Sequence, residues 1–452
     1  MSETTNDIEN ILNILGFSEL NPMQKTAIEA IHEHDNVQLL AATGSGKTLA
    51  FLIPILKSLQ ADIKVPQALI IVPSRELALQ IEKVFKSMRT TIKITCCYGG
   101  HKREIEENEL VDPPLVIVGT PGRLGDHIRR NNFSTEHIRF LVLDEFDKSL
   151  ELGFQEEVQF ITDGLKNVKK QMLTSATDAI DIPEFIKWKN PKLVNFLLEE
   201  SQPKALTIQK ATSDKKDKVE FLLQLICQIG ARPTIIFCNH RESVERLSYH
   251  LWEKGVINEY YHGAMDQRER EAALAKFRNG STQFLITTDL AARGLDIAHI
   301  RYIIHYHLPL TEDAFIHRNG RTARMDASGT AILILGPDEE FPEYLDEATV
   351  EEVQWNPPFE LPEKPKWVSL YIPLGKKNKV NKTDVVGFLT NVGALKPDEI
   401  GIIEVKDFHI FVAIRKSKAT HTFHLIKDGL IKGKKAKAEI VKQQFRTNRE
   451  FL

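Results

Sequence analysis

The chain has 452 residues, of which 42% are hydrophobic and 27% are charged, an ordinary composition for a globular protein. No apolar run approaches 18 residues and the start of the chain is acidic and polar, which argues against a transmembrane helix and a secretory signal. This length exceeds what one hydrophobic core usually holds and predicts two or three domains. Four cysteines without Cys-x-x-Cys spacing predict buried free thiols in a reducing, cytoplasmic setting.

The net charge of −3 conceals an uneven distribution. Residues 366–452 contain 18 Lys and Arg against 8 Asp and Glu, so this stretch carries +10 and the remainder of the chain −13. A basic end on an acidic body is typical of a nucleic-acid contact confined to that end. A solvated lysine-rich surface would give the same count.

The first chemical motif follows a short apolar run at residues 38–41, which predicts a buried strand. A glycine-rich turn leads from it into an amphipathic helix, so backbone N–H groups and the helix N-terminus would face an anion. Lys47 would reach the β- and γ-phosphates of a nucleotide, and the Thr48 hydroxyl would ligate Mg²⁺. A chance turn before a helix is the alternative, but all parts occur in the required order. The predicted nucleotide-binding residues are Ala42, Thr43, Gly44, Ser45, Gly46, Lys47 and Thr48.

A second apolar run, residues 140–143, delivers Asp144 and Glu145 to the carboxyl end of a strand, where ligands of open α/β sheets bind. Asp144 would hold Mg²⁺, and Glu145 would orient or deprotonate the attacking water. Taken alone, an acidic strand end is more often a solvated turn. After the phosphate cradle, the pair indicates an enzyme that hydrolyses a nucleoside triphosphate.

Strands and helices alternate through the first half of the chain, which predicts a parallel sheet covered on both faces. A polar interval near residues 199–204 interrupts the pattern, and the alternation that follows contains no Gly-Lys-Thr/Ser sequence. We predict one α/β domain at 1–203 and another at 204–350, which would complete the single nucleotide site across a cleft. The predicted strands are 38–41, 68–73, 115–119, 140–144 and 171–174 in the first domain, and 234–237, 284–287, 302–304 and 331–334 in the second.

The segment 337–365 is acidic and rich in proline, and we predict the last helix of the second domain followed by a linker at 351–365. The remaining residues, 366–452, show the pattern strand, helix, strand, strand, helix, strand. This order is ferredoxin-like and is shared by RNA-recognition motifs.

Residues 8–340 resemble the DEAD-box RNA helicases of superfamily two. The resemblance implies two tandem RecA-like domains followed by the small ferredoxin-like α+β domain, with ATP and Mg²⁺ as cofactors and RNA as the partner. Besides the cradle and Asp144-Glu145-Phe146-Asp147, the matching stretches are Gly16-Phe17, Asn21-Pro22-Met23-Gln24, Pro73-Ser74-Arg75-Glu76-Leu77-Ala78, Gly99-Gly100, Thr120-Pro121-Gly122-Arg123, Ser175-Ala176-Thr177, Gln267-x-x-Arg270, Thr287 to Asp296, and His317 to Arg324.

The resemblance also implies roles at the nucleotide. Gln24 would read the adenine edge, because a side-chain amide donates and accepts at once. Asp296 would join the nucleotide site. Arg321 and Arg324 would act as arginine fingers that stabilise charge on the γ-phosphoryl group, beside the catalytic residues Lys47, Asp144 and Glu145.

Further implied roles concern coupling and RNA. The hydroxyls of Ser175 and Thr177 would bond Asp147 and so link the ATP site to domain closure. Such RNA contacts are made with phosphates or by close approach of the backbone. They set the position of the protein on the strand and do not read the base sequence. The implied contacts are Arg75, Gly99, Gly100, Thr120, Arg123, Gln267, Arg270, Thr287 and Arg293.

Three positions depart from the family pattern: Phe146 stands where Ala is usual, His307 replaces Asp, and Ala323 replaces Gly. The Phe146 ring is larger than the usual Ala side chain, so neighbouring side chains at the end of the strand must make room for it. We expect ATP hydrolysis to survive, since none of the three changes removes a group with a chemical role.

Residues 366–452 resemble, more loosely, the RNA-binding domain of DbpA-type bacterial helicases, which target ribosomal RNA. Lys376 and Lys377 lie in a predicted loop and would contact phosphates. Tyr371 and Phe411 would either stack on bases or pack in the core, and His409 falls where a further aromatic is expected.

We therefore expect an ATP-dependent RNA helicase that locally unwinds RNA duplexes, acts on structured ribosomal RNA in ribosome assembly and associates with a pre-ribosomal particle. We expect a cytoplasmic monomer without membrane contact. The alternatives are an ATP-gated RNA clamp or assembly scaffold with little unwinding, an enzyme acting on DNA, and a protein-docking role for residues 366–452.

Overall fold

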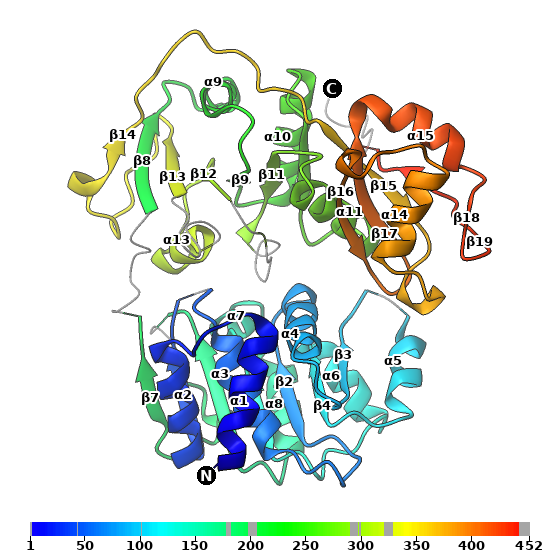
Figure 1. The fold of residues 1–452 in the computed structure, drawn as a ribbon. Helices are drawn as coiled ribbons and strands as arrows, with labels where there is room; N and C mark the ends of the chain where they lie inside the picture. The colour runs from blue at the N-terminus through cyan, green and yellow to red at the C-terminus, as the bar shows by residue number, and fades with distance from the viewer. Residues whose placement is uncertain are drawn as a thin grey trace. The chain divides into compact units, whose positions relative to one another are not determined.

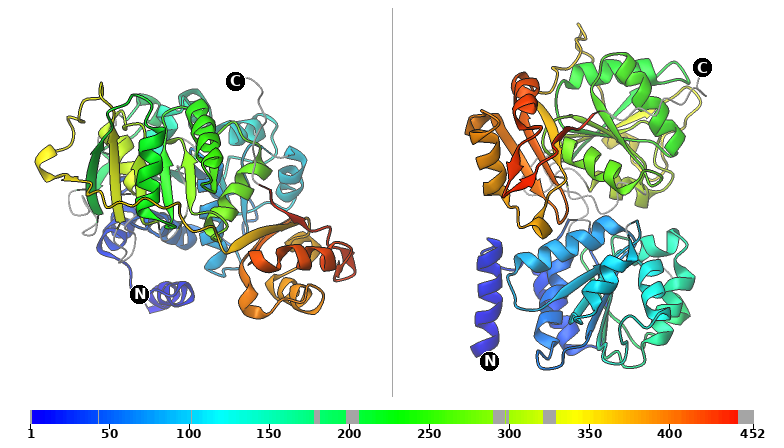
Figure 2. Two further views of the ribbon diagram at one scale, coloured as in Figure 1. Left: turned by 90° about the horizontal axis from the view of Figure 1, so that it is seen from above. Right: turned by 90° about the vertical axis from the view of Figure 1, so that its right-hand side faces the viewer.

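The computed structural model describes residues 2–42, 44–100, 102–177, 182–197, 206–289, 297, 300–320 and 329–442, with side chains from residue 8 onward. The chain forms two compact units, one built on Met1–Pro203 and the other on Lys204–Ala292 with Ile297–Leu452. The elements of each unit are drawn in Figures 1 and 2. Among the described residues, no helix is both long and apolar enough to cross a membrane.

The first unit is a parallel sheet with the strand order β3-β4-β2-β5-β6-β1-β7. Its strands are β1 (Asn36–Leu40), β2 (Ala68–Ile71), β3 (Ile94–Cys97), β4 (Val116–Gly119), β5 (Phe140–Leu143), β6 (Lys170–Ser175) and β7 (Lys192–Asn195). Its helices are α1 (Ser2–Leu15), α2 (Pro22–Glu33), α3 (Lys47–Ser58), α4 (Arg75–Ser87), α5 (Arg103–Leu110), α6 (Pro121–Arg129), α7 (Phe146–Glu151) and α8 (Gln155–Gly164), with a 3₁₀ turn η1 (Glu184–Ile186).

Both faces of this sheet are covered, as the short apolar strands predict. Within β2, Ala68 and Ile70 belong to a core cluster that includes residues of α2, α3 and α4. Leu69 and Ile71 alternate with them and belong to a second cluster with residues of α6 and α8. Because the strands pair in parallel, their carboxyl ends lie at one edge of this covered sheet.

The second unit contains another parallel sheet, with the order β10-β11-β9-β12-β13-β8-β14. Its strands are β8 (Leu206–Thr212), β9 (Thr234–Phe237), β10 (Asn258–Tyr261), β11 (Phe284–Thr287), β12 (Tyr302–His305), β13 (Gly329–Leu335) and β14 (Glu351–Glu352). Its helices are α9 (Val219–Ile229), α10 (Arg241–Glu253), α11 (Gln267–Arg278) and α13 (Glu312–Asn319), with a 3₁₀ turn η2 (Glu347–Thr349). The two parallel sheets confirm the predicted fold class.

The same unit ends in a small antiparallel sheet with the ferredoxin-like order β16-β17-β15-β20. Its strands are β15 (Trp367–Ile372), β16 (Ile400–Val405), β17 (Ile410–Arg415) and β20 (Glu439–Ile440), and a hairpin joins β18 (Leu430–Ile431) to β19 (Lys434–Lys435). Its helices are α14 (Lys382–Asn391) and α15 (Ala419–Ile426), with 3₁₀ turns η3 (Lys376–Asn378), η4 (Pro397–Glu399) and η5 (Lys416–Lys418). We call this part the C-terminal domain.

The sheet of the C-terminal domain packs on α11 of the same unit. Phe411 is buried against Ala272 and Ala275 of that helix, with Tyr371 beside it. Phe411 is therefore a core residue, but of the contact with α11 rather than of its own domain. The contact also contains the hydrogen bond from Asn279 to Ser369 (2.7 Å) and the ion pairs Arg268–Glu439 (2.8 Å) and Arg278–Glu404 (3.5 Å). In addition, His409 Nε2 lies 2.8 Å from a carboxylate oxygen of Glu271.

The proline-rich segment 337–365 differs from its prediction. Its described residues contain η2 and β14 but no α-helix, so the expected last helix of the second domain is wrong. At the start of the predicted linker, Glu351 and Glu352 align with Gln209 and Lys210 of β8 and extend the sheet.

Candidate active site

The glycine-rich loop connects the end of β1 to the start of α3. Gly44 and Gly46 have φ values of 90° and 92°, a backbone region that only glycine adopts without strain. Lys47 is 8% exposed, and its Nζ donates to the carbonyl oxygens of Ala41 (2.5 Å) and Ala42 (2.9 Å). The ammonium group of Lys47 is thus held by the backbone of the segment that leads into the loop. Of the predicted nucleotide-binding residues, Thr43 lies outside the described part of the chain.

Asn21, the N-cap of α2, and Gln24 in the first turn of that helix hold this loop in place. Asn21 Nδ2 donates to the Ser45 carbonyl (2.8 Å), and Gln24 Nε2 donates to the Gly46 carbonyl (3.1 Å). Asn21 and Gln24 also form a reciprocal capping box at the start of α2, which fixes both side chains. A Cβ on Gly46 would lie 2.5 Å from Gln24 Nε2, so the close approach requires glycine. Positioning of the loop by Asn21 is a role that sequence reasoning missed.

The acidic pair lies at the end of β5, two strands from β1, with β6 between them. Asp144 and Glu145 are both buried, and burial raises the pKa of Asp144 while a hydrogen bond from the Thr174 hydroxyl opposes that rise. The Glu145 N–H donates to the same hydroxyl oxygen (3.2 Å). Glu145 has a φ of 48°, an uncommon conformation for a residue other than glycine, and turns the chain from β5 into α7. Thr174 of β6 thereby fixes both acidic residues.

The predicted coupling residues have other partners in the structure. Ser175 Oγ donates to the Thr177 carbonyl (2.8 Å) and accepts from the Thr177 N–H (3.0 Å). Burial raises the pKa of Asp147 to about 6, although the Lys148 ammonium 3.3 Å away lowers it. Hydrogen bonding from Ser175 and Thr177 to Asp147 therefore stays a prediction, while Thr174, one residue earlier, bonds the acidic pair.

The predicted RNA contacts of the first unit gather at three turns. Arg75 begins α4, and its guanidinium packs on Gly100, whose φ is 100° and where a Cβ would overlap the arginine. Gly99 directly precedes Gly100 in the same turn. Thr120 is the N-cap of α6, and Arg123 in the first turn of that helix donates to Glu106 (2.8 Å).

In the second unit, Gln267 and Arg270 lie on the first turn of α11, with Arg270 Nη2 donating to the Tyr261 hydroxyl (3.1 Å). Thr287 ends β11, is buried and donates to the Thr288 carbonyl (3.2 Å). The RNA contact predicted at Arg293, the nucleotide contact at Asp296 and the arginine fingers at Arg321 and Arg324 lie outside the described residues.

A buried arginine at the end of α13 was not singled out from the sequence. Arg318 is bound by the Asp289 carboxylate (2.5 Å), the Asn239 side chain (2.8 Å) and the His307 carbonyl (2.7 Å). Burial, followed by nearby positive charge, lowers the pKa of His307 to about 4 and that of His305 well below its usual value. Two neutral imidazoles can lie beside a buried guanidinium without repulsion, so a histidine is tolerated at position 307.

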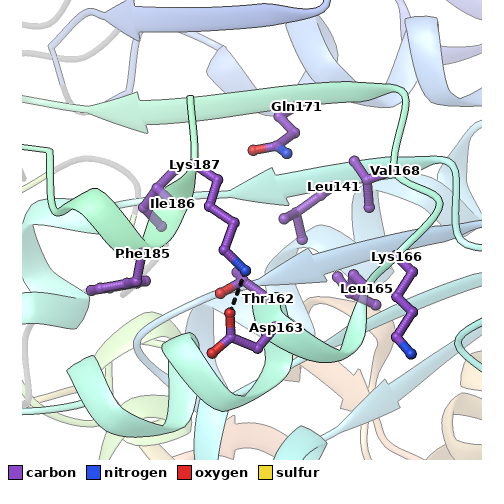
Figure 3. A pocket seen from close by; sticks show the side chains of 10 residues that line it. All are labelled: Leu141, Thr162, Asp163, Leu165, Lys166, Val168, Gln171, Phe185, Ile186 and Lys187. Atoms are coloured by element: carbon purple, nitrogen blue, oxygen red, sulfur yellow. Dashed lines mark hydrogen bonds and ion pairs between the residues drawn. The ribbon is translucent and has the colours of Figure 1, made fainter. Parts of the chain in front are cut away.

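A cavity of about 300 Å³ lies in the first unit, away from the strand ends just described (Figure 3). Leu141 and Gln171, near the starts of β5 and β6, contribute to its lining, and the Asp163–Lys187 ion pair (2.6 Å) spans its rim. None of the predicted site residues lines it.

Lysines gather at one end of the C-terminal domain. The exposed Lys376 and Lys377 lie in η3, whose backbone N–H groups bond the carbonyls of Lys406 and Asp407. Lys432 Nζ donates to the Lys379 carbonyl (2.7 Å) and so joins the β18–β19 hairpin to this loop.

Comparison with known proteins agrees with this geometry. Residues 21–184 match the DEAD/DEAH box helicase family, 217–326 the helicase conserved C-terminal domain, and 369–440 the DbpA RNA binding domain. The ATP-dependent RNA helicase DbpA of Bacillus subtilis is 31% identical over 466 residues (96% of this chain, 97% of the relative), and that of Escherichia coli is 31% identical over 442 residues (95% and 96%). The structure of S. cerevisiae Dbp5 bound to RNA and ADP BeF3 has a TM-score of 0.65 at 26% identity, over 74% of this chain and 88% of that one. The chain thus belongs to the DEAD/DEAH box helicases and is an ATP-dependent RNA helicase of the DbpA type.

Proposed function

We propose that this helicase couples ATP hydrolysis to the local separation of short RNA duplexes, and that its target is structured ribosomal RNA during ribosome assembly. One observation carries the proposal: Lys47 follows β1, Asp144 and Glu145 follow β5, and Thr174 of the intervening β6 bonds both acidic residues. A phosphate-binding lysine facing a fixed acidic pair is the arrangement that hydrolysis of a triphosphate requires.

The residues at these strand ends fit Mg²⁺. The Thr48 hydroxyl and the Asp144 carboxylate offer the hard oxygen ligands that this ion prefers, and a site with few protein ligands suits an ion that is also held by phosphates. When bound, Mg²⁺ would neutralise charge on the phosphate oxygens. We propose Thr48 and Asp144 as its protein ligands.

Each residue of the site has a task in the proposed reaction. Lys47 exchanges two backbone carbonyls for phosphate oxygens, so its buried ammonium group stays hydrogen-bonded throughout. Glu145 orients the attacking water and accepts its proton. The hydrogen bond to Thr174 stabilises the left-handed backbone of Glu145, so the turn that carries the carboxylate is already formed before reaction.

The proposed function is tested by following strand separation and ATP turnover in the same samples. A duplex beside a fragment of ribosomal RNA should be separated with ATP, and turnover should rise with RNA but not with DNA of the same sequence. Turnover without separation would favour an ATP-gated clamp. Equal stimulation by DNA would contradict RNA as the substrate.

A first prediction concerns the lysine loop of the C-terminal domain. Replacing Lys376 and Lys377 by alanine should weaken RNA binding similarly for all sequences, because phosphate contacts carry no sequence information. Each lost contact should also reduce the slope of log K against log salt by about 0.7 for a single strand. Lys57→Ala, an exposed lysine on α3, is the matched control. Unchanged affinity and salt dependence in the double variant would exclude the loop from RNA binding.

A further inference from the structure

Glu106 of α5 is a buried carboxylate, 1% exposed, on which three hydrogen-bond donors converge. Its Oε1 accepts the backbone N–H of Tyr98 (2.8 Å). Its Oε2 accepts from Arg123 Nη1 (2.8 Å) and lies 2.7 Å from His127 Nε2. A buried carboxylate is costly unless it is paired and hydrogen-bonded, so this cluster is organised around Glu106.

The protonation of His127 follows from its second partner. Asn132 Nδ2 lies 2.8 Å from His127 Nδ1 and can only donate there, so Nε2 carries the proton and donates to Glu106. Asn132 Nδ2 also lies 3.3 Å from Glu107 Oε1. Together these bonds join α5 to α6 and leave the Glu106 side chain a single arrangement.

The three donors belong to the segments that hold the proposed RNA contacts. Tyr98 directly precedes Gly99 and Gly100, and Arg123 is itself a proposed contact on α6. We propose that Glu106 is a positioning residue, which holds Arg123 and the Gly99–Gly100 turn in the arrangement that grips RNA phosphates. This inference rests on the proposed RNA-binding function. Its physical basis is entropic, since an arginine fixed before binding loses less side-chain freedom when RNA arrives.

A metal site is the competing explanation, since Cys97 lies close to Glu106 and His127 and their ligand atoms fall within 4.8 Å of one another. Zinc takes such ligands, but it requires a thiolate and an unprotonated imidazole nitrogen. Burial raises the pKa of the Cys97 thiol well above its usual value, and His127 Nε2 already donates its proton to Glu106. The Arg123 guanidinium also repels a cation at this carboxylate. The hydrogen bonds account for the cluster without an ion.

The test is a double-mutant cycle in the full-length protein, read out as the KM for RNA in RNA-stimulated ATP turnover. Arg123→Ala should raise this KM by about 10- to 100-fold, the effect of losing a hydrogen bond to a charged group. Glu106→Gln should raise it by a smaller factor, with kcat at saturating RNA little changed. In the Arg123→Ala background, Glu106→Gln should add almost nothing, because the glutamine oxygen can still accept the Tyr98 N–H and the lost carboxylate oxygen acts through the missing arginine.

Glu104→Gln, an exposed carboxylate in the first turn of the same helix, is the matched control and should leave the KM for RNA unchanged. Asn132→Ala is a second variant, at a partly exposed residue. It can replace Glu106→Gln in the test if that variant does not fold. It should raise the same KM modestly, and again only while Arg123 is present.

The outcomes distinguish a failure of the RNA contact at Arg123 from a failure of the positioning role of Glu106. If Arg123→Ala leaves the KM for RNA unchanged, both the RNA contact and the positioning role are wrong. If Arg123→Ala raises it but the Glu106→Gln effect is absent or fully additive, only the positioning role is wrong. One equivalent of zinc in the purified protein, lost in Cys97→Ser, would also overturn the proposal.

Discussion

Replacing Glu145 with glutamine is expected to lower the RNA-stimulated turnover of ATP by about 10²–10⁴-fold, the usual contribution of a positioned general base. The amide has nearly the shape of the carboxylate, and the backbone N–H of residue 145 still donates to Thr174 (3.2 Å), so the turn should persist. What is lost is the acceptor for the proton of the attacking water. Steady-state turnover at saturating RNA is the measurement.

Lys47→Ala separates binding from chemistry at the same site. Loss of a charged hydrogen-bond donor typically costs about 1.5–3 kcal/mol, so ATP affinity should fall by about 10- to 100-fold. Equilibrium binding of ATP measures this, and Glu145→Gln should retain most of the affinity. Glu156→Gln, an exposed carboxylate in the first turn of α8, is the matched control. Full turnover in both site variants would show that these residues do not form the nucleotide site.

The strands that form the site could be predicted because they satisfy one simple rule. Thr234–Phe237 and Phe284–Thr287 are strands with the predicted bounds, and each is a short apolar run that is buried throughout. A parallel sheet covered on both faces requires such runs. The glycine loop and the acidic pair could also be predicted, because each is a short continuous stretch of sequence.

In the two parallel sheets, the strands β3, β7, β8, β10 and β14 were not predicted, and the burial of β10 depends on distant partners. β10 contains the polar residues Asn258 and Glu259, so a search for short apolar runs does not identify it as a strand. In the structure both are buried because Ser248 bonds Asn258 (2.6 Å) and Lys276 forms an ion pair with Glu259. These partners come from α10 and α11, so the pattern of one segment does not reveal the strand.

The same limit applies to the finer details of the site. Thr174 is an unremarked threonine in sequence, and only the register of β5 against β6 brings it to Asp144 and Glu145. The C-terminal domain is a larger example. Its strand order was predictable, but burial of Phe411 requires the complementary surface of α11, which lies more than a hundred residues earlier.

Phe146→Ala, which restores the residue usual in the family, is expected to destabilise the first unit by about 3–5 kcal/mol. Phe146 is 1% exposed and belongs to the core cluster that contains Leu143 and Leu173. Removing the ring would leave a cavity among side chains that cannot collapse freely, since β5 and β6 hold them in place. Phe146→Leu, which fills most of this space, should cost much less.

Hydrogen exchange of the amides in β5 and β6 measures the effect within the full chain. A loss of 3–5 kcal/mol corresponds to exchange about 10²- to 4 × 10³-fold faster where opening is global. Phe160→Ala in the same unit is the control, because that ring is 37% exposed and its loss should cost far less. Protection that is unchanged in Phe146→Ala would show that the ring does not fill the core.

The same variant also separates stability from catalysis. Asp144 and Glu145 keep their hydrogen bonds to Thr174, which do not involve the Phe146 ring. Turnover per folded molecule, measured well below the unfolding temperature, should therefore stay close to that of the unchanged protein. A loss of turnover comparable to that of Glu145→Gln would mean that the ring itself holds the acidic pair. The large side chain in this motif would then be part of the site rather than of the core beneath it.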